Sequence, residues 1–241
     1  KHQKFSDYLT TLRELCHGLY PDDSTEHGKI LRLRQQYFLV SAGLQSAIRG
    51  HLRKYGTLDN FADKYVFQLN DTHPILAIPE LMRLVMDVYG YGWDYAWDIV
   101  TKCIAYTNHT ILAEALEKWT VHYIQRLIPR IYMIIEEINR RFNLFLSDNN
   151  IDENARRDMQ IIKDGQVHMA NLAIYTCYST NGVAAIHTEI LKETTFSSFY
   201  NLFPERFNNK TNGITHRRWF LYSNEKLSSY VSEKIGTDWI L

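Results

Sequence analysis

The sequence predicts a helix-rich α/β fold, in which short strands that end in polar residues are followed by amphipathic helices. The first observation is the segment 64–81, KYVFQLNDTHPILAIPEL, which has the pattern of a strand, a polar loop and a helix. The second is the segment 104–110, IAYTNHT, another short apolar run that ends in Asn, His and Thr. The third is a set of apolar stripes at helical spacing over much of the remaining chain.

Two helices are predicted before the first strand. Residues 5–19 and 28–52 both carry apolar side chains at helical spacing, and the turn 20–25, YPDDST, contains residues that usually cap a helix. The amphipathic pattern of the first helix fits a contact with its own domain or with a second subunit. Arg32 and Arg34 of the second helix are interpreted as part of a solvated face.

The first strand is predicted over residues 65–69, as a buried strand rich in β-forming side chains. Pro79 then occupies a first helical turn, where proline is tolerated. Between them, Asp71 and His73 fall at the carboxyl end of the strand, where α/β sheets bind their ligands. An Asx turn with a surface histidine explains the same residues equally well.

The second strand end repeats this arrangement. A helix over residues 93–102 precedes it, and Asn108, His109 and Thr110 follow its apolar part. Two polar strand ends in one sheet would converge on the same crevice. Taken alone, His109 fits a hydrogen-bonded core histidine. Because a second strand end also carries a histidine, a functional role becomes an equal alternative.

The rest of the chain is predicted as further helices and short strands. In order, these are a helical region over 111–146 with breaks near Trp119 and Pro129, a loop with a short helix over 147–158, strands within 161–177 joined by a turn at 164–165, a helix from 181, a loop-to-helix segment over 207–219, and one helix over 220–241. The segment 207–219, FNNKTNGITHRRW, is rich in amides, which suit sugar hydroxyls because they donate and accept. A capped helix start with surface arginines is the alternative. His187 is interpreted as structural.

Composition excludes several classes of protein. The 241 residues include 27 basic and 27 acidic side chains, which argues against a nucleic-acid surface or a polybasic membrane patch. No apolar run approaches the ~18 residues of a membrane span, and no signal-peptide core is present. Cys16, Cys103 and Cys177 are odd in number and far apart, which predicts three unpaired core thiols in a reducing, cytoplasmic compartment. Without CxxC or HExxH, no zinc site is expected. The absence of an initiating Met indicates a piece of a longer protein.

Three stretches together carry a resemblance to a known family. They are YVFQLNDTHPILAIPEL, AYTNHTILAEALEKW and FNNKTNGITHRRW, and they resemble the α-glucan phosphorylases, the family of glycogen, starch and maltodextrin phosphorylases. Intervening segments such as LYPDDSTEHGKILRLRQQYF and GVAAIHTEILK fit as well. These motifs are long and specific, and the resemblance runs across essentially the whole chain.

The resemblance implies a two-domain, doubly wound (Rossmann-like) α/β glycosyltransferase with its site between the domains. This chain would be an internal fragment of it. Residues 1–20 would be an amphipathic helix used for subunit contacts in a homodimer. Residues 21–212 would be the later part of the N-terminal domain, and residues 213–241 the start of the C-terminal one.

The resemblance also implies roles for individual residues. His109, the catalytic candidate, resembles the histidine that bonds the 6-hydroxyl of the glucosyl unit at the cleavage point, and Asn212 resembles the asparagine that bonds the same hydroxyl. Asp71 and His73 resemble the pair that lines the anomeric side of that sugar. Asp23 resembles an acidic residue of the mobile loop that gates the site.

A further role and two departures concern other positions. Trp219 resembles a tryptophan that packs near pyridoxal phosphate, the cofactor of the family. Ser24 and Thr25 replace the asparagine and the aromatic residue of the animal enzymes, which puts an animal-type gate in doubt. His216 stands where proline is common.

In this family, phosphate attacks the terminal α-1,4-glucosidic bond with retention and releases glucose 1-phosphate. The phosphate of the cofactor moves the proton, so a pair of catalytic carboxylates is not needed. The cofactor lysine has no match here, and the isolated chain is therefore expected to be inactive. Two alternatives are a glycoside hydrolase using Asp23 and Asp71, and a non-catalytic glucan-binding or dimerisation module.

Overall fold

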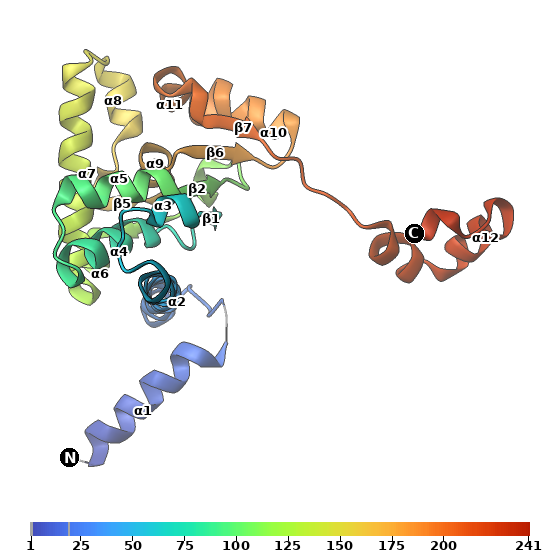
Figure 1. Cartoon of the computed structure of the whole chain (residues 1–241), viewed down its shortest axis with the longest axis horizontal. Coiled ribbons are helices and arrows are strands. Elements are labelled where there is room, and N and C mark those ends of the chain that lie inside the picture. The colour runs from blue at the N-terminus through green and yellow to red at the C-terminus, as the bar shows by residue number, and fades with distance from the viewer. Residues whose placement is uncertain (1, 19) are drawn as a thin grey trace.

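A computed structural model describes residues 2–18 and 20–241, which form a helix-rich α/β chain with a parallel sheet. Figure 1 shows a body of helices packed around this sheet, with α1 (His2–His17) leaving the body on one side. On the other side, an extended run leads to a separate helical segment around α12 (Glu225–Ile235). The predicted α/β class and the predominance of helix are confirmed.

The main sheet contains four short strands, and all of its pairings are parallel. In spatial order the strands are β1 (Phe67–Asn70), β2 (Ile104–Thr107), β6 (Ser179–Gly182) and β7 (Phe207–Asn209). The register aligns Asn70 with Thr107, and Thr107 with Asn181. Because the strands point the same way, their polar carboxyl ends lie along one edge of the sheet.

The first strand differs from its sequence prediction. A buried strand was expected over residues 65–69, but β1 begins two residues later, and only Leu69 within it is buried. Val66, just before the strand, is 59% exposed. The reason is the position of β1 at the edge of the sheet, where it pairs with β2 alone among the strands of residues 2–18 and 20–241.

The first half of the chain supplies most of the helices that were predicted. They are α2 (Glu26–Tyr55), α3 (Phe61–Lys64), α4 (Ala77–Arg83) with its π-helical continuation η1 (Leu84–Val88), and α5 (Trp93–Cys103). Thr25 caps α2, because its hydroxyl accepts the Gly28 N–H at 3.1 Å. Gly56 ends α2 with a φ of 72°, a conformation that glycine adopts readily. The predictions over 28–52 and 93–102 are confirmed.

A long insertion separates β2 from β6. Its elements are η2 (Ala113–Ala115), β3 (Lys118–Thr120), α6 (Val121–Leu127), α7 (Pro129–Asp148), α8 (Glu153–Met159), β4 (Ile162–Lys163), β5 (Gln166–His168) and α9 (Met169–Thr176). The order β3-β5-β4 forms a small antiparallel sheet, with a turn at the predicted Asp164–Gly165.

Two predictions in this insertion need correction. The break expected near Trp119 is confirmed, because Trp119 pairs with Val167 of β5. The helix expected before this break was wrong, because residues 111–117 contain only the short 3₁₀ turn η2. Residues 169–176 form the helix α9, although their apolar run indicated a strand. All residues of α9 except Tyr175 are buried, so the helix has no polar face to reveal its period.

The last third of the chain contains the remaining elements. They are α10 (Ala185–Ile190) with its π-helical continuation η3 (Leu191–Thr195), α11 (Ser197–Leu202), the 3₁₀ turn η4 (Pro204–Arg206), the π-helical η5 (Arg217–Tyr222), α12, and the 3₁₀ turn η6 (Asp238–Ile240). Asn181 lies within the strand β6, which ends at Gly182, so neither residue opens the helix as predicted, and α10 begins at Ala185. The single helix predicted over 220–241 was also wrong, because Asn224 caps a new helix and Gly236, with a φ of 83°, ends it.

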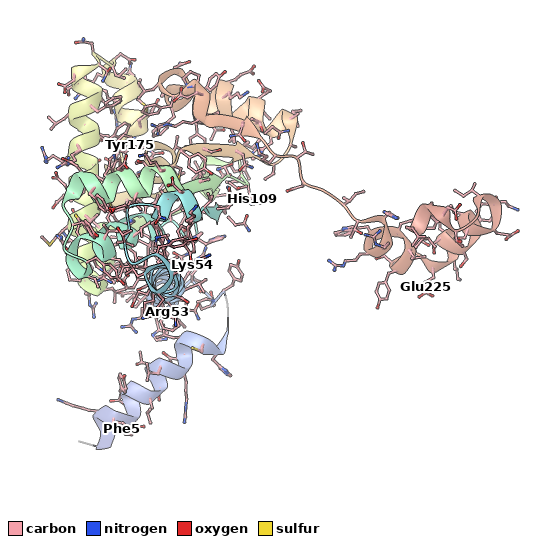
Figure 2. The ribbon with its side chains drawn as sticks, in the orientation of Figure 1. Phe5, Arg53, Lys54, His109, Tyr175 and Glu225 are labelled. Atoms are coloured by element: carbon pink, nitrogen blue, oxygen red, sulfur yellow. The ribbon has the colours of Figure 1, made fainter. Side chains whose placement is uncertain are left out.

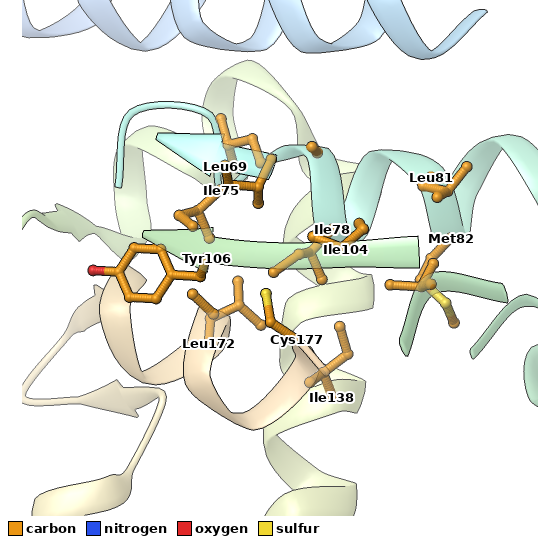
Figure 3. Close-up of a cluster of buried hydrophobic side chains, with 14 of the residues drawn as sticks. Leu69, Ile75, Ile78, Leu81, Met82, Ile104, Tyr106, Ile138, Leu172 and Cys177 are labelled. Carbon is orange, nitrogen blue, oxygen red and sulfur yellow. The ribbon is translucent and has the colours of Figure 1, made fainter. Parts of the chain in front are cut away.

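The core lies between the main sheet and α4, α7 and α9. Figure 3 shows Tyr106 and Ile104 of β2 packed among side chains from these helices, including Leu172 and Ile138. The predicted apolar stripe of α7 is at most 1% exposed; it consists of Ile131, Ile134, Ile135, Ile138 and Phe142. Fully burying such a side chain contributes about 1.5–3 kcal/mol. This core fixes the strands whose ends carry the polar side chains.

The three cysteines do not all belong to the core. Cys103 and Cys177 are buried, whereas Cys16 is exposed on α1. The prediction of three core thiols is therefore wrong for Cys16, whose side chain is exposed although the carbonyl of its neighbour Leu15 accepts from Gln35 of α2 at 3.4 Å. The predicted stripe of this helix also included Leu19, which lies outside the described residues.

Candidate functional site at the carboxyl edge of the sheet

His109 follows β2 and is held at the carboxyl edge by the neighbouring strand. Its Nε2 donates to Oδ1 of Asn70, the last residue of β1, at 2.5 Å. A neutral imidazole with its proton on Nε2 leaves the Nδ1 lone pair as an acceptor. Figure 2 shows His109 on the side of the body from which the run to the C-terminal segment leaves. The predicted convergence of the two histidine-bearing strand ends is confirmed.

Asp71 lies directly after β1 at the same edge. Its φ is 63°, in the left-handed region that Asp tolerates better than most residues. Its N–H donates to the Thr107 carbonyl at 2.8 Å, and its Oδ1 accepts the N–H and the hydroxyl of Thr72 at 2.6 and 3.1 Å. These bonds fix the direction of the carboxylate at the carboxyl edge of the sheet.

Asp23 and His73 meet through a third residue, Arg32. The Nη1 of Arg32 donates to Oδ2 of Asp23 at 2.8 Å, and its Nη2 lies 3.3 Å from Nδ1 of His73. The Tyr20 ring packs edge-on against His73, with centroids 5.9 Å apart. The solvated face predicted for Arg32 was wrong, because its side chain is only 22% exposed.

Asn212 reaches the same edge from β7. Its N–H donates at 2.9 Å to the carbonyl of Val183, the residue after β6. The order of strands places β6 between His109 and Asn212, which corresponds to roughly 10 Å across the sheet at about 4.8 Å per strand. The Asn212 side chain is exposed. An imidazole and an amide therefore belong to the same edge of the sheet, one strand apart.

Trp219 is not part of this cluster. It belongs to η5, which packs against α12 in the segment that lies apart from the body in Figure 1. Its side chain is 67% exposed. His216 lies in the same segment, where its Nε2 donates to the Ile240 carbonyl at 3.3 Å and its ring packs 5.9 Å from Trp239.

Sequence analysis missed the hydrogen bonds that support the edge from behind. His187 accepts the Val183 N–H on Nδ1 at 3.0 Å and donates from Nε2 to the Asn108 side chain at 3.2 Å. Burial, and to a smaller extent the nearby His109, lower the pKa of His187. Asn108 is fully buried, and the structural interpretation of His187 is confirmed. The sequence carried one signal for these bonds. Asn108 lies at the end of a buried strand, and a buried amide requires a hydrogen-bond partner.

A cavity opens beside Asp23 and Arg32. Its volume is about 380 Å³, within the range of small-molecule sites, and Glu117 and Trp119 also line it. Glu117 is 11% exposed and accepts a hydrogen bond from Gln36 at 2.9 Å. The wall of this cavity is thus mostly polar, which suits a ligand rich in hydroxyl groups.

Membrane-spanning helices and clustered metal-ligating side chains are both absent from the described residues, 2–18 and 20–241. No helix among them is both long and apolar enough to cross a bilayer. No group of three or more His, Cys, Asp or Glu side chains among them is arranged to hold a metal ion.

This geometry defines a class of protein. It is a helix-rich α/β chain, in which polar groups that suit hydroxyls lie along the edge of a parallel sheet. The model of the carbohydrate phosphorylase family matches residues 1–241. The chain belongs to this family.

The relatives of the chain are long phosphorylases. It is 51% identical over 223 residues to a glycogen phosphorylase of Bacillus subtilis, a match that covers 92% of this chain and 28% of the relative. It is 49% identical to a maltodextrin phosphorylase of Streptococcus pneumoniae, with 97% and 30% covered. It is 48% identical to the muscle form of human glycogen phosphorylase, with 92% and 28% covered. The chain therefore spans less than a third of the length of these relatives.

Proposed function

We propose that this chain provides the sugar-binding edge of an α-1,4-glucan phosphorylase. The longer enzyme would cleave terminal α-1,4-glucosidic bonds with phosphate and release glucose 1-phosphate with retention. The names of the relatives support the reaction. The observation that carries the proposal is the bond between His109 and Asn70, which holds an imidazole at the carboxyl edge of the sheet beside Asp71.

In this proposal, His109 and Asn212 bind the 6-hydroxyl of the glucosyl unit at the cleavage point. The Nδ1 of His109 accepts the hydroxyl proton, since its Nε2 already donates to Asn70. The amide of Asn212 donates to the oxygen of the same hydroxyl. Two neutral partners orient the sugar without adding charge, which leaves the electrostatics of the developing oxocarbenium ion to other groups.

Asp71 and His73 line the anomeric side of the same sugar. The carboxylate of Asp71 is ready to stabilise positive charge at the anomeric carbon, because the Thr72 bonds hold it at the strand end. His73 presents an Nε2–H donor, since its Nδ1 accepts from Arg32. Asp23, bonded to Arg32, belongs to a loop over the entrance of this pocket.

We assign pyridoxal phosphate as the cofactor of the longer enzyme, with its lysine outside this chain. The exposed Trp219, and the exposed Arg217 and Arg218 beside it, suit an aromatic phosphate ester, because indole packs on a ring and guanidinium pairs with phosphate. When bound, the cofactor supplies the phosphate group that moves the proton. The residues of this chain bind and orient the sugar. Without the lysine, the isolated chain is inactive.

The domain organisation is also part of the proposal. Residues 21–212 would form the later part of an N-terminal domain, and residues 213–241 the start of a C-terminal one. The extended run before η5, which separates two packed bodies in Figure 1, supports a boundary near Asn212. The doubly wound sheet would need strands from the rest of the enzyme, because the four strands of the main sheet follow one another in chain order without a reversal.

We further propose a homodimer that uses α1. Phe5, Tyr8 and Leu12 are 62%, 59% and 42% exposed on this helix, and Figure 2 shows Phe5 far from the body. Burying such a surface is the usual reason for its presence. Sedimentation of the longer enzyme should give a dimer, and Phe5→Glu with Tyr8→Glu should give a monomer. A monomeric parent would contradict this assignment. The unpaired thiols and a cytosolic Arabidopsis thaliana relative support a cytoplasmic location.

A chimaera tests the sugar-site assignment directly. This chain would replace the matching segment of the Bacillus subtilis glycogen phosphorylase, to which it is 51% identical. We expect His109→Ala and Asn212→Ala each to lower kcat/KM by at least about tenfold, which is roughly 1.4 kcal/mol of lost transition-state stabilisation. Wild-type rates in both folded variants would refute the roles assigned to His109 and Asn212. Binding of maltodextrin without turnover would instead support a glucan-binding module.

A further inference from the structure

We propose that Arg32 is a positioning residue of this sugar site, which fixes the tautomer of His73 and seats the loop of Asp23 against it. Only the effect of Arg32 on catalysis rests on the proposed function. The geometry that carries it lies within the body of the chain and is measurable without activity.

The guanidinium of Arg32 contacts three segments that are distant in the sequence. Its Nη1 donates to Asp23 at 2.8 Å, and its Nη2 lies 3.3 Å from Nδ1 of His73 and 3.5 Å from Oε1 of Glu117. These contacts join the loop before α2, the loop after β1 and the segment before β3. A guanidinium is planar and rigid, so its fork holds all three partners in fixed directions.

Glu117 and Gln36 hold this fork in place. Gln36 lies one turn after Arg32 on α2, and its amide donates at 2.9 Å to the Glu117 oxygen that faces Arg32. The other carboxylate oxygen of Glu117 is buried and has no hydrogen-bond partner among the residues that the structure describes. An ionised carboxylate in such a place needs a nearby cation, and Arg32 supplies it.

The contact with Arg32 determines which nitrogen of His73 carries the proton. A guanidinium has five N–H donors and no acceptor, so Nδ1 of His73 must accept and Nε2 must be protonated. The Tyr20 ring, edge-on at 5.9 Å, adds a second contact that limits rotation of the imidazole. The imidazole is therefore held with Nε2 as its N–H donor.

The loop of Asp23 is seated by the same guanidinium. The ion pair between Asp23 and Arg32 is half-exposed at its carboxylate, and exposed pairs add only about 0–1 kcal/mol to stability. Its importance is geometric, because it holds the loop of residues 20–25 next to His73. Hydrogen bonds from Ser24 to Asp22, which lower the pKa of Asp22, shape the loop itself.

The first test uses this chain and the ¹⁵N chemical shifts of its histidine rings. In the wild type we expect His73 to show a single tautomer with the proton on Nε2. Arg32→Met should give a mixture of tautomers at His73, and should speed amide exchange in residues 20–25. Arg34→Met is the matched control, because Arg34 lies on the same helix but lines the groove beside α1. An unchanged His73 signal in folded Arg32→Met would overturn the proposal.

The second test uses the chimaera with the Bacillus subtilis enzyme. We expect Arg32→Met to lower kcat/KM by five- to fiftyfold, and Arg32→Lys to recover part of this loss, because lysine keeps the charge but not the fork. Arg34→Met should keep the parent rate. A parent rate in Arg32→Met would overturn the positioning role. Absence of glucose 1-phosphate from the unmutated, folded chimaera would instead count against the proposed function, while the tautomer result would still decide the geometry.

Discussion

Gly28 offers the sharpest test of how the loop of residues 20–25 is seated. It lies in the first turn of α2, and a Cβ added there would fall 1.7 Å from the carbonyl oxygen of Asp22. Real Cβ atoms do not approach backbone oxygen so closely, so Gly28→Ala must push the loop away. Gly43 is the matched control in the same helix, because a Cβ there meets nothing within 4 Å.

The expected free energies follow from what each substitution changes. Gly43→Ala gains the helix propensity of alanine, about 0.5–1 kcal/mol. Gly28→Ala gains a similar amount but displaces the loop. This costs the Thr25 cap, about 1 kcal/mol, and the half-exposed bond between Asp23 and Arg32, up to about 1 kcal/mol. The unfolding free energies of the two variants should therefore differ by about 1–2 kcal/mol, with Gly28→Ala the less stable.

Urea unfolding followed by circular dichroism measures this difference, provided that all three proteins share one transition. The ring ¹⁵N signals of His73 report the loop independently, and they should change in Gly28→Ala alone. Equal stabilisation by both substitutions, with the His73 signals unchanged, would refute the close packing of Asp22 on Gly28.

Three further predictions concern the body of the chain. Glu80 is fully buried and accepts two hydrogen bonds from Arg83, so Glu80→Ala should lower the unfolding free energy by about 3–5 kcal/mol in urea titrations. Burial lowers the pKa of His187 below 6.5, so the unfolded chain binds the proton more tightly than the folded chain does. The free energy of unfolding should therefore fall as the pH drops below 6.5. This fall should be smaller in His187→Gln. Cys16 alone should react with iodoacetamide at pH 7.5, because Cys103 and Cys177 are buried. Mass spectrometry of the native chain should show one label, and a second label would contradict this prediction.

The sequence indicated the strand ends well, because their signals are local. The segment around Asp71 and His73 and the segment around His109 each join a β-rich run to polar residues within a few positions. Parallel pairing then brings the two ends together, as the bond between Asn70 and His109 shows. The helical stripe of α7 was equally readable, because its apolar side chains all face one core.

The features that were missed depend on contacts between distant parts of the chain. Arg32 and His73 are 41 positions apart, and nothing near Arg32 distinguishes it from Arg34 in the sequence. The strands β6 and β7, STNG and FNN, have too little apolar pattern to be recognised, and they become strands through pairing with their neighbours. Only β2 and the helices around it determine where these polar strands lie.

The product of the reaction tests the proposed function most directly. The chimaera would be given maltoheptaose with and without phosphate, and its products separated and quantified. The proposal predicts α-glucose 1-phosphate that requires phosphate, at a rate that falls at least about tenfold in His109→Ala. Glucose released without phosphate would indicate hydrolysis, and no product from a folded, cofactor-loaded chimaera would contradict the assignment of this edge as a phosphorylase sugar site.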